Sequence, residues 1–296
     1  MGDISVASDF ERFCKKLRMS ETTVSNIQNR YHAIAKRINL DYWNSTSDTA
    51  HSLYVGSYGR GTCIYTSDID IIVELPWSEY TRYNNYSGNG QSALLAALRC
   101  CLLKTYSSSS VSADGQVVDI AFSDGIKLEV VPAFKYSNGS GYCYPDTNDG
   151  GSWKSMNPKQ EIDCFNGRNS ICNGNLKRLS RMLRAWKNKH TILMSGILLD
   201  TTAYRFLQGY EHADRSFTYY DWMSRDYFKF LLDNADQVYW SKPGDTGYVK
   251  REYSIKSDAQ FAYNKALEAL ADYDRGFRYC WYQDWREIYG TRFSES

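Results

Sequence analysis

The stretch that decides the fold is GSYGRGT at residues 56–62, which is followed by SDIDIIVEL at residues 67–75. Gly56 lets backbone N–H groups approach an anion closely, and the hydroxyls of Ser57 and Thr62 add polar contacts. A glycine–serine turn alone is common, and this one lacks the lysine of a P-loop. Because an Asp-x-Asp pair follows within a few residues, the two motifs together indicate a site that handles phosphate groups.

The acidic pair of the second motif begins a predicted strand. Residues 69–75 are rich in β-branched side chains and are closed by Pro76. Side chains two residues apart point to the same face of a strand, so Asp68 and Asp70 project together. Two carboxylates this close repel each other unless a cation lies between them, and oxygen ligands suit Mg²⁺. The alternatives are a strand-entry cap for Asp68 and an exposed edge position for Asp70.

A predicted hairpin carries a third carboxylate. The strands at residues 117–122 and 126–131 flank Asp-Gly at residues 124–125, which is a strong turn signal. If these two residues form the turn, Asp119 and Glu129 lie on opposite faces of the hairpin. On this reading, Asp119 cannot replace Glu129 in a shared site.

Glu129 is a polar residue in a strand that otherwise looks buried, because Leu128 and Val130 flank it. A buried carboxylate needs a partner. A metal ion shared with the acidic pair would supply that partner. The alternative is a surface position in which Glu129 pairs with Lys127.

The predicted elements run from a helix to a small sheet and then to further helices. Predicted helices cover residues 24–38, 91–106, 175–189, 196–208, 220–233 and 259–273, and short strands cover residues 53–55, 69–75, 117–122 and 126–131. Residues 136–151 are rich in Ser, Asn, Gly and Asp and are predicted as a surface loop. This order predicts an α+β fold with a mixed-sheet lobe at residues 1–160 and a helical lobe at residues 161–296.

The helix at residues 175–189 is the clearest of these. Asn175 is its predicted cap, and its buried stripe is formed by Leu176, Leu179, Leu183 and Trp186. The opposite stripe carries three cations, Lys177, Arg181 and Arg184. From the residues alone, such a stripe is a solvated basic face. Ser20 is the predicted cap of the first helix.

The composition is that of a folded protein without a dominant charge. The 296 residues are 43% apolar and 15% aromatic, and their formal charge is +1. This argues against disorder and against a protein that mainly coats nucleic acid. The eight cysteines show no C-x-x-C pair and no zinc-ligand spacing with histidine, so we expect reduced thiols in a cytoplasmic protein. No segment has the pattern of a signal peptide or a membrane span.

The motifs GSYGRGT, SDIDIIVEL and LEVVPAF resemble those of nucleotidyltransferases of the polymerase-β-like superfamily. More narrowly, the chain resembles the CD-NTases, which carry a SMODS-type domain and are bacterial relatives of cyclic GMP–AMP synthase and oligoadenylate synthase. The narrower resemblance uses WKSMNPKQEI, LKRLSRMLRAWK and DWMSRDYFKFL at residues 153–162, 176–187 and 221–231. It implies a bilobed polymerase-β-like enzyme with the nucleotide between a catalytic and a helical lobe.

The resemblance also implies the chemistry. Two Mg²⁺ ions, with Mn²⁺ as an alternative, would be held by Asp68, Asp70 and Glu129. The third acid is more often Asp in relatives, and Glu keeps the charge while adding one methylene of reach. A ribose hydroxyl of one nucleoside triphosphate would attack the α-phosphate of another and release pyrophosphate. The expected product is a cyclic di- or trinucleotide that a downstream effector protein senses in antiphage (CBASS) signalling.

Residues that bind the nucleotide are carried over in the same way. Gly56, Ser57 and Thr62 would contact the nucleotide from the glycine turn. Arg184 and Ser195 would contact the triphosphate, with Ser195 at a helix N-terminus. In relatives a tyrosine after this serine stacks on a base, but here the residue is glycine. Stacking would come from another ring, and Tyr54, Tyr58, Trp153 and Tyr204 are the candidates.

The sequence leaves the substrate bases open among ATP, GTP and pyrimidine nucleotides. It shows neither a zinc insertion nor a strongly basic platform, so we expect no requirement for DNA. Two other readings remain. The chain could transfer nucleotides to tRNA, a protein or a small molecule, or it could be an inactive nucleotide-binding homologue.

Overall fold

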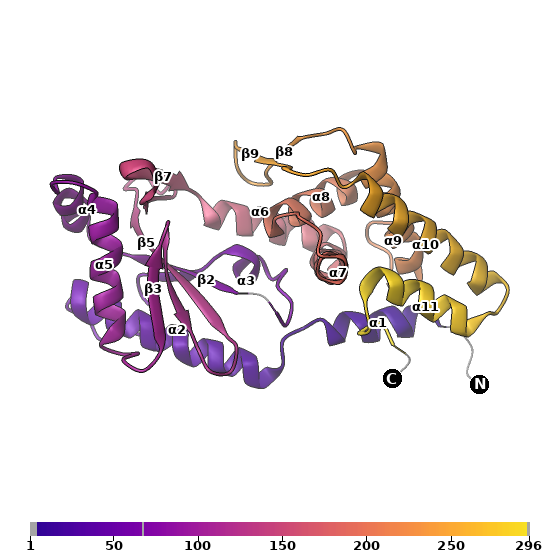
Figure 1. Ribbon diagram of the computed structural model, residues 1–296, viewed down its shortest axis with the longest axis horizontal. Coiled ribbons are helices and arrows are strands. Elements are labelled where there is room, and N and C mark those ends of the chain that lie inside the picture. Colours follow the sequence, from indigo (N-terminus) through magenta and orange to yellow (C-terminus); the bar gives the residue numbers. More distant parts are fainter. Residues whose placement is uncertain (1–4, 67, 295–296) are drawn as a thin grey trace. The chain divides into compact units, whose positions relative to one another are not determined.

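The computed structural model describes residues 5–66 and 68–294, which form two compact units (Figure 1). The helical unit comprises Met1–Met19, Arg60–Thr66 and Glu161–Ser296, and the sheet unit comprises Ser20–Gly59 and Ser67–Gln160. A break falls after residue 160, where the sequence analysis divides the chain. In contrast to that analysis, residues 5–19 and 60–66 group with the helical unit and not with the sheet unit.

Within the described residues, the sheet unit is built on a mixed seven-stranded sheet. Its strands are β1 (Ser52–Tyr54), β2 (Ile69–Glu74), β3 (Ser110–Asp114), β4 (Val117–Ala121), β5 (Lys127–Lys135), β6 (Tyr142–Asp146) and β7 (Ser152–Met156). They follow the order β1-β2-β5-β4-β3, while β6 pairs with β5 and with β7. β2 and β5 run parallel and the other neighbours antiparallel, so the two motif strands lie side by side.

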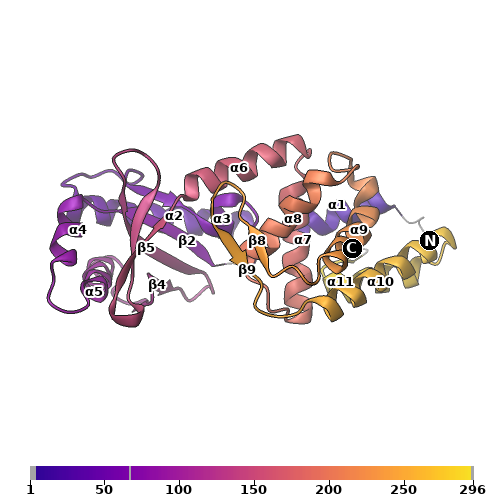
Figure 2. The ribbon, with the colours of Figure 1, turned by 90° about the horizontal axis from the view of Figure 1, so that it is seen from above.

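Helices pack against this sheet and bury its apolar side. α2 (Glu21–Tyr42) begins after the predicted cap Ser20, whose hydroxyl accepts a hydrogen bond from the N–H of Thr23 at 3.1 Å. α2 contacts β2 and α5 (Gly90–Leu103), and α5 contacts β3 and β4. Figure 2 shows the helices and strands of this unit from above. The sheet unit also contains α4 (Trp77–Asn84) and a 3₁₀ turn, η1 (Asn148–Gly150). α3 (Gly56–Arg60) lies where the chain passes from this unit to the helical unit.

The hairpin register differs from the prediction by one residue. The N–H of Phe122 donates to the carbonyl of Ile126 at 3.0 Å, and the N–H of Gly125 donates back to Phe122 at 3.0 Å. Residues 123–125 therefore form a three-residue loop, with Gly125 at φ +82°. A shift of one residue moves every side chain to the other face, so Asp119 lies opposite Glu129 and shares its face. The prediction that they lie on opposite faces was wrong.

The predicted surface loop at residues 136–151 is also more ordered than expected. β6 begins within it and pairs in register with β7, from Tyr142 opposite Met156 to Asp146 opposite Ser152. Alternation explains why composition missed this strand. Cys143 and Pro145 are buried, and the polar and glycine residues gather in the turns on either side.

The helical unit surrounds one aromatic and aliphatic core. Its helices are α1 (Val6–Lys16), α6 (Pro158–Ile171), α7 (Asn175–His190), α8 (Gly196–Gly209), α9 (Tyr220–Asp233), α10 (Lys256–Asp274) and α11 (Arg278–Tyr289). A 3₁₀ turn, η2 (Phe217–Tyr219), precedes α9, and the hairpin of β8 (Tyr239–Ser241) and β9 (Tyr248–Lys250) precedes α10. The predicted apolar stripe of α7 is confirmed, because all four of its residues are fully buried.

The predicted cap of α7 is corrected by the structure. Gly174 occupies the cap position in a left-handed conformation, and Asn175 is the first helical residue. The Asn175 amide instead donates to the carbonyls of Ala213 at 2.9 Å and Arg215 at 2.7 Å. It therefore ties the start of α7 to the segment before η2.

The eight cysteines are all free thiols, as expected. Among the described residues, no helix combines the length and apolar character needed to cross a bilayer.

Candidate active site

Three carboxylates form a row across neighbouring strands of the sheet unit. Asp70 on β2 is the register partner of Glu129 on β5, and Glu129 is the register partner of Asp119 on β4. Residues paired in this way share a face of a sheet. All three are partly exposed, whereas Ile69 and Leu128 beside them are fully buried on the opposite face. The sheet register thus brings the second and third predicted acids together and adds a fourth, Asp119.

Gly56 contacts this row directly. Its φ is +57°, which disfavours residues with a side chain. A Cβ atom at this position would lie 1.8 Å from Oδ2 of Asp70. The carboxylate of Asp70 therefore packs against the backbone of the glycine turn, and only glycine leaves room for it. The close approach predicted for this glycine is found, but the anion that it meets in this structure is Asp70.

The charges around the row are unbalanced. Lys127 Nζ lies 2.7 Å from Oε1 of Glu129 and 3.2 Å from Oδ1 of Asp119, so one ammonium serves two carboxylates. The pKa of Asp68 is raised above its ordinary value, first by burial and then by the charge of Glu129, with Lys127 opposing. Asp68, which precedes β2, is therefore close enough to Glu129 for their charges to repel.

The pairing of Glu129 with Lys127 was the alternative open from the sequence, and the structure contains it. Over residues 5–66 and 68–294, no three Asp, Glu, His or Cys side chains are grouped closely enough to hold a metal ion. The donor set nevertheless fits Mg²⁺ in kind, since hard carboxylate oxygens project from adjacent strands. The repulsion acting on Asp68 is also of the kind that a divalent cation relieves.

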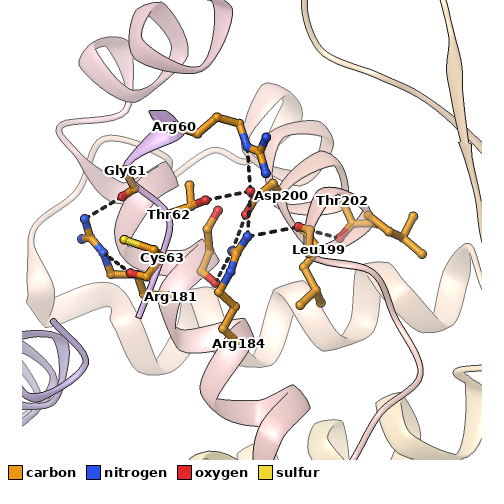
Figure 3. A network of polar contacts seen from close by, with 12 residues as sticks. Arg60, Gly61, Thr62, Cys63, Arg181, Arg184, Leu199, Asp200 and Thr202 are labelled. Atoms are coloured by element: carbon orange, nitrogen blue, oxygen red, sulfur yellow. Dashed lines mark hydrogen bonds and ion pairs between the residues drawn. The ribbon is translucent and has the colours of Figure 1, made fainter. Parts of the chain in front are cut away.

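Arg184 is buried and takes part in a network of polar contacts around Asp200 (Figure 3). It is buried in the helical unit, where its Nη2 donates to Oδ2 of Asp200 at 2.9 Å and to the carbonyl of Gly196 at 3.2 Å. Its Nη1 pairs with the other oxygen of Asp200 and donates to the carbonyl of Ser180. A buried guanidinium requires a counter-charge, and Asp200 supplies it here. In this structure the donors of Arg184 serve Asp200 and two backbone carbonyls, so its predicted contact with a triphosphate stays a prediction.

Thr62, the predicted nucleotide contact, also has an internal partner. It is fully buried, and its hydroxyl donates to Oδ2 of Asp200 at 2.7 Å. Arg60 Nε reaches the same oxygen at 2.9 Å and also pairs with Glu161. Burial alone would raise the pKa of Asp200, but the charges of Arg184 and Arg60 outweigh burial and lower it. Asp200 is thus the centre of a buried ionic network that Figure 3 shows within the helical unit.

The other two cations of α7 also have internal partners. Arg181 donates to the carbonyl of Gly61 at 2.6 Å and to that of Cys63 at 3.3 Å. Lys177 Nζ donates to Asn166 at 2.6 Å. The three cations therefore do not act as one solvated stripe. The sequence carried a signal for this network, namely the single acid, Asp200, in the otherwise apolar or neutral start of α8.

Ser195 is the N-cap of α8, as predicted, and is exposed. Its hydroxyl oxygen accepts a hydrogen bond from the N–H of Leu198 at 3.3 Å, which leaves its O–H able to donate elsewhere. It lines a groove of about 540 Å³ in the helical unit. Other lining residues are Lys187, Asn188, Leu198, Lys250 and Tyr253. The sequence analysis did not identify Lys187 and Tyr253 as candidate site residues, although Lys187 lies one turn beyond Arg184 on α7.

The rings proposed for base stacking differ in how far they are already engaged. Tyr204 is buried, with its hydroxyl 3.4 Å from the sulfur of Cys164, and offers no free face. Tyr54 stacks on Tyr31 with ring centroids 4.1 Å apart. The ring of Tyr58 contacts that of Tyr54 in a tilted arrangement, and Trp153 packs against Tyr80 and Phe134. In contrast, Tyr253 is 57% exposed beside Ser195 in the groove.

Comparison with solved structures identifies proteins of the same fold. The chain is similar to CdnC from E. coli MS115-1, solved with ATP, at 15% identity and a TM-score of 0.68 over 99% of both chains. It is similar to CdnG from Bradyrhizobium diazoefficiens at 12% identity and 0.68, over 98% of this chain and 96% of that chain. It is also similar to DncV of Vibrio cholerae, a cyclic AMP-GMP synthase, at 12% identity and a TM-score of 0.71, over 95% of this chain and 94% of that chain. The chain therefore shares the fold of these proteins.

The family follows from the sequence. The profile of the Second Messenger Oligonucleotide or Dinucleotide Synthetase (SMODS) domain matches residues 4–169, which is more than half of the chain. The chain belongs to this family, and it is a nucleotidyltransferase of the CD-NTase type. Comparison with curated protein sequences finds no match.

Proposed function

We propose that this enzyme joins nucleoside triphosphates into a cyclic di- or trinucleotide in a reaction that depends on Mg²⁺. The observation that carries the proposal is the register of β2 and β5, which pairs Asp70 with Glu129 on one face. Gly56 packs against Asp70, and Asp68 precedes the same strand. Family membership supports the synthesis of an oligonucleotide or dinucleotide messenger.

Asp68, Asp70 and Glu129 are the residues that would hold Mg²⁺, and Mn²⁺ could replace it. The metal would supply Lewis-acid stabilisation of charge on the α-phosphate and on the oxygens that bond to it. The contribution of the chain is to fix the carboxylates. The backbone of Gly56 restrains Asp70, and the strand pairing restrains Glu129. Asp119 adds negative charge beside Glu129 and shares Lys127 with it.

Ser57 and Ser195 are proposed to orient the phosphates, Ser57 from the glycine turn and Ser195 from the start of α8. Arg184 has no place in this proposal, because its donors serve Asp200. Lys187 is a better source of positive charge, since it lines the same groove as Ser195. Its pKa is lowered by burial and by the charge of Arg184, and a bound anion would offset both effects. Tyr253 in that groove offers an exposed ring to a base.

Overall, the bonds exchanged are the same whichever bases are joined. An O–P bond forms between a ribose hydroxyl and the α-phosphate, the bond to pyrophosphate breaks, and the hydroxyl proton is lost. Closure into a ring requires this exchange at least twice. ATP and GTP are the proposed substrates because relatives of the same fold were solved with ATP and with GTP. Antiphage signalling through an effector protein that senses the product is proposed from the family resemblance.

The test is mass spectrometry of the product after incubation with all four nucleoside triphosphates and Mg²⁺. A phosphatase-resistant cyclic oligonucleotide is expected. Label on added tRNA or protein would favour a modifying transferase, and unchanged substrate would indicate an inactive homologue. Asp70→Asn should abolish turnover and weaken Mn²⁺ binding measured by electron paramagnetic resonance. Asp114→Asn, an exposed aspartate at the end of β3, is the matched control and should leave both unchanged.

DNA provides a second, independent arm of the test. Because the chain has a formal charge of +1, we expect double-stranded DNA to leave the rate unchanged at physiological salt. A large increase on adding DNA would show that the expectation is wrong without affecting the assignment of the carboxylates.

A further inference from the structure

A second concave feature of the helical unit uses none of the residues proposed for catalysis. It is a small pocket of about 150 Å³ between α1, α7 and η2. We call it the basic pocket. Its lining includes four cationic side chains, Lys15, Arg18, Arg178 and Arg181, against one carboxylate, Glu11. Such an excess of positive charge is unusual in a chain whose total formal charge is +1.

The single carboxylate of the basic pocket is already engaged. Glu11 Oε1 lies 2.8 Å from Lys15 Nζ, one turn along α1. The thiol of Cys14, which also lines the pocket, adds no negative charge, because burial raises its pKa to about 12. Among the described residues, no carboxylate lies within ion-pair distance of the three arginines. The charge of Glu11 acts on Arg178 from beyond that distance, so the arginines of the basic pocket have no carboxylate in direct contact.

Two of the arginines are nevertheless held in place by neutral oxygen atoms. Arg178 donates to the carbonyl of Asn173 at 2.8 Å and to the side chain of Asn175 at 3.1 Å. Its guanidinium carbon lies 4.8 Å from the centre of the Phe217 ring. Arg181 is fixed by the carbonyls of Gly61 and Cys63. These bonds set the positions of the guanidinium groups without neutralising them.

Arg18 completes the cluster from the exposed segment after α1. Burial and the charge of Arg18 both lower the pKa of Arg181, so the two cations are close enough to repel each other. Like charges held together at a fixed separation cost free energy, and an anion between them would recover it. The basic pocket is thus organised for an anionic ligand.

We infer that the basic pocket binds a phosphoryl group, either of free phosphate or of a phosphorylated small molecule. Guanidinium groups present paired N–H donors that match the oxygens of a phosphate. The volume is below the roughly 300–1,000 Å³ of pockets that enclose a whole drug-sized ligand. A phosphoryl group fits within it, and the rest of a larger ligand would extend into solvent.

The experiment is a titration of inorganic phosphate into the full chain, without nucleotide or divalent metal, at constant ionic strength. Calorimetry and the midpoint of thermal unfolding are both followed. We expect saturable binding and a rise in the midpoint that sodium chloride does not reproduce. A linear response that matches sodium chloride would overturn the inference. Phenyl phosphate is the second probe: tighter binding than free phosphate would identify a phosphorylated small molecule as the ligand, and weaker binding would identify free phosphate.

Arg18 is the residue to change, because it is exposed and its removal leaves the core intact. Arg18→Ala should weaken phosphate binding about 10-fold, or more, as expected for the loss of a charged hydrogen-bond donor. Lys36→Ala, an exposed cation on α2 in the sheet unit, removes the same charge and should leave binding unchanged. Equal effects of the two substitutions would refute a defined site. The outcome does not depend on the proposed synthase activity.

Discussion

Replacing Gly56 by alanine tests the arrangement of the proposed metal site most directly. The new Cβ atom would lie 1.8 Å from Oδ2 of Asp70, far inside any real contact distance. The carboxylate of Asp70 must therefore retreat by more than about 1 Å, and a misplacement of about 1 Å can cost roughly 100-fold in rate. We expect the turnover number to fall by at least about 100-fold.

The same substitution also strains the backbone, and this effect must be separated from the loss of activity. A left-handed conformation costs a residue with a side chain about 1–2 kcal/mol. Gly115 provides the control, because it has almost the same φ, +58°, and a Cβ atom there would meet nothing within 4 Å. Gly115→Ala should lower the free energy of unfolding by about 1–2 kcal/mol and leave turnover unchanged.

The assay is pyrophosphate release with saturating nucleotides and Mg²⁺, alongside urea denaturation of each variant. Loss of turnover in Gly56→Ala, at a stability similar to that of Gly115→Ala, is the expected pattern. If Gly56→Ala stays folded and keeps more than about a tenth of wild-type turnover, the position of Asp70 does not govern catalysis.

Three further predictions concern the charged groups. Asp200→Ala leaves Arg60 and Arg184 buried without their shared partner, so urea denaturation should show a fall of about 3–5 kcal/mol in the free energy of unfolding. A fall below about 1 kcal/mol would contradict the network. Burial raises the pKa of Asp221 to about 6, so ionising it costs stability as the pH rises from 4 to 7. Asp221→Asn should therefore stabilise the protein by up to about 3 kcal/mol at pH 7 and by almost nothing at pH 4, whereas a gain independent of pH would refute the assignment. Lys127→Gln removes a cation that competes with the metal for Glu129, so Mg²⁺ titrations of activity should show half-saturation at an about 2- to 5-fold lower concentration. A higher requirement would show that Lys127 assists the site instead.

The sequence predicted those parts of the site that depend on local spacing. Asp68 and Asp70 lie at the predicted start of a strand, and Ser195 caps a helix at the predicted position. The buried stripe of α7 follows directly from its 3.6-residue period. The α+β architecture was also predictable, because most strands lie in the first half of the chain and helices dominate the second half.

The remaining errors arise from features that spacing does not encode. The place of Asp119 depends on whether the hairpin loop has two or three residues, and one residue reverses its face. The internal partner that Arg184 and Thr62 share, Asp200, could not be identified from periodicity or from the motifs. Thr62 and Asp200 are 138 positions apart in the chain. Contacts between residues so far apart in the chain can be identified only from the folded structure.

The helical unit is assembled from three separated pieces of the chain, and this limits how the protein can be cut. A fragment ending at residue 160 would retain α1 and residues 60–66 but lose nearly everything that they contact in that unit. Phe10 and Phe13 would lose Trp285, Tyr289 and Phe293, and Arg60 would face solvent without its acids. A fragment cut at residue 160 is therefore not an independent folding unit. To exchange the helical unit between related enzymes, all three of its chain pieces would have to be transferred together.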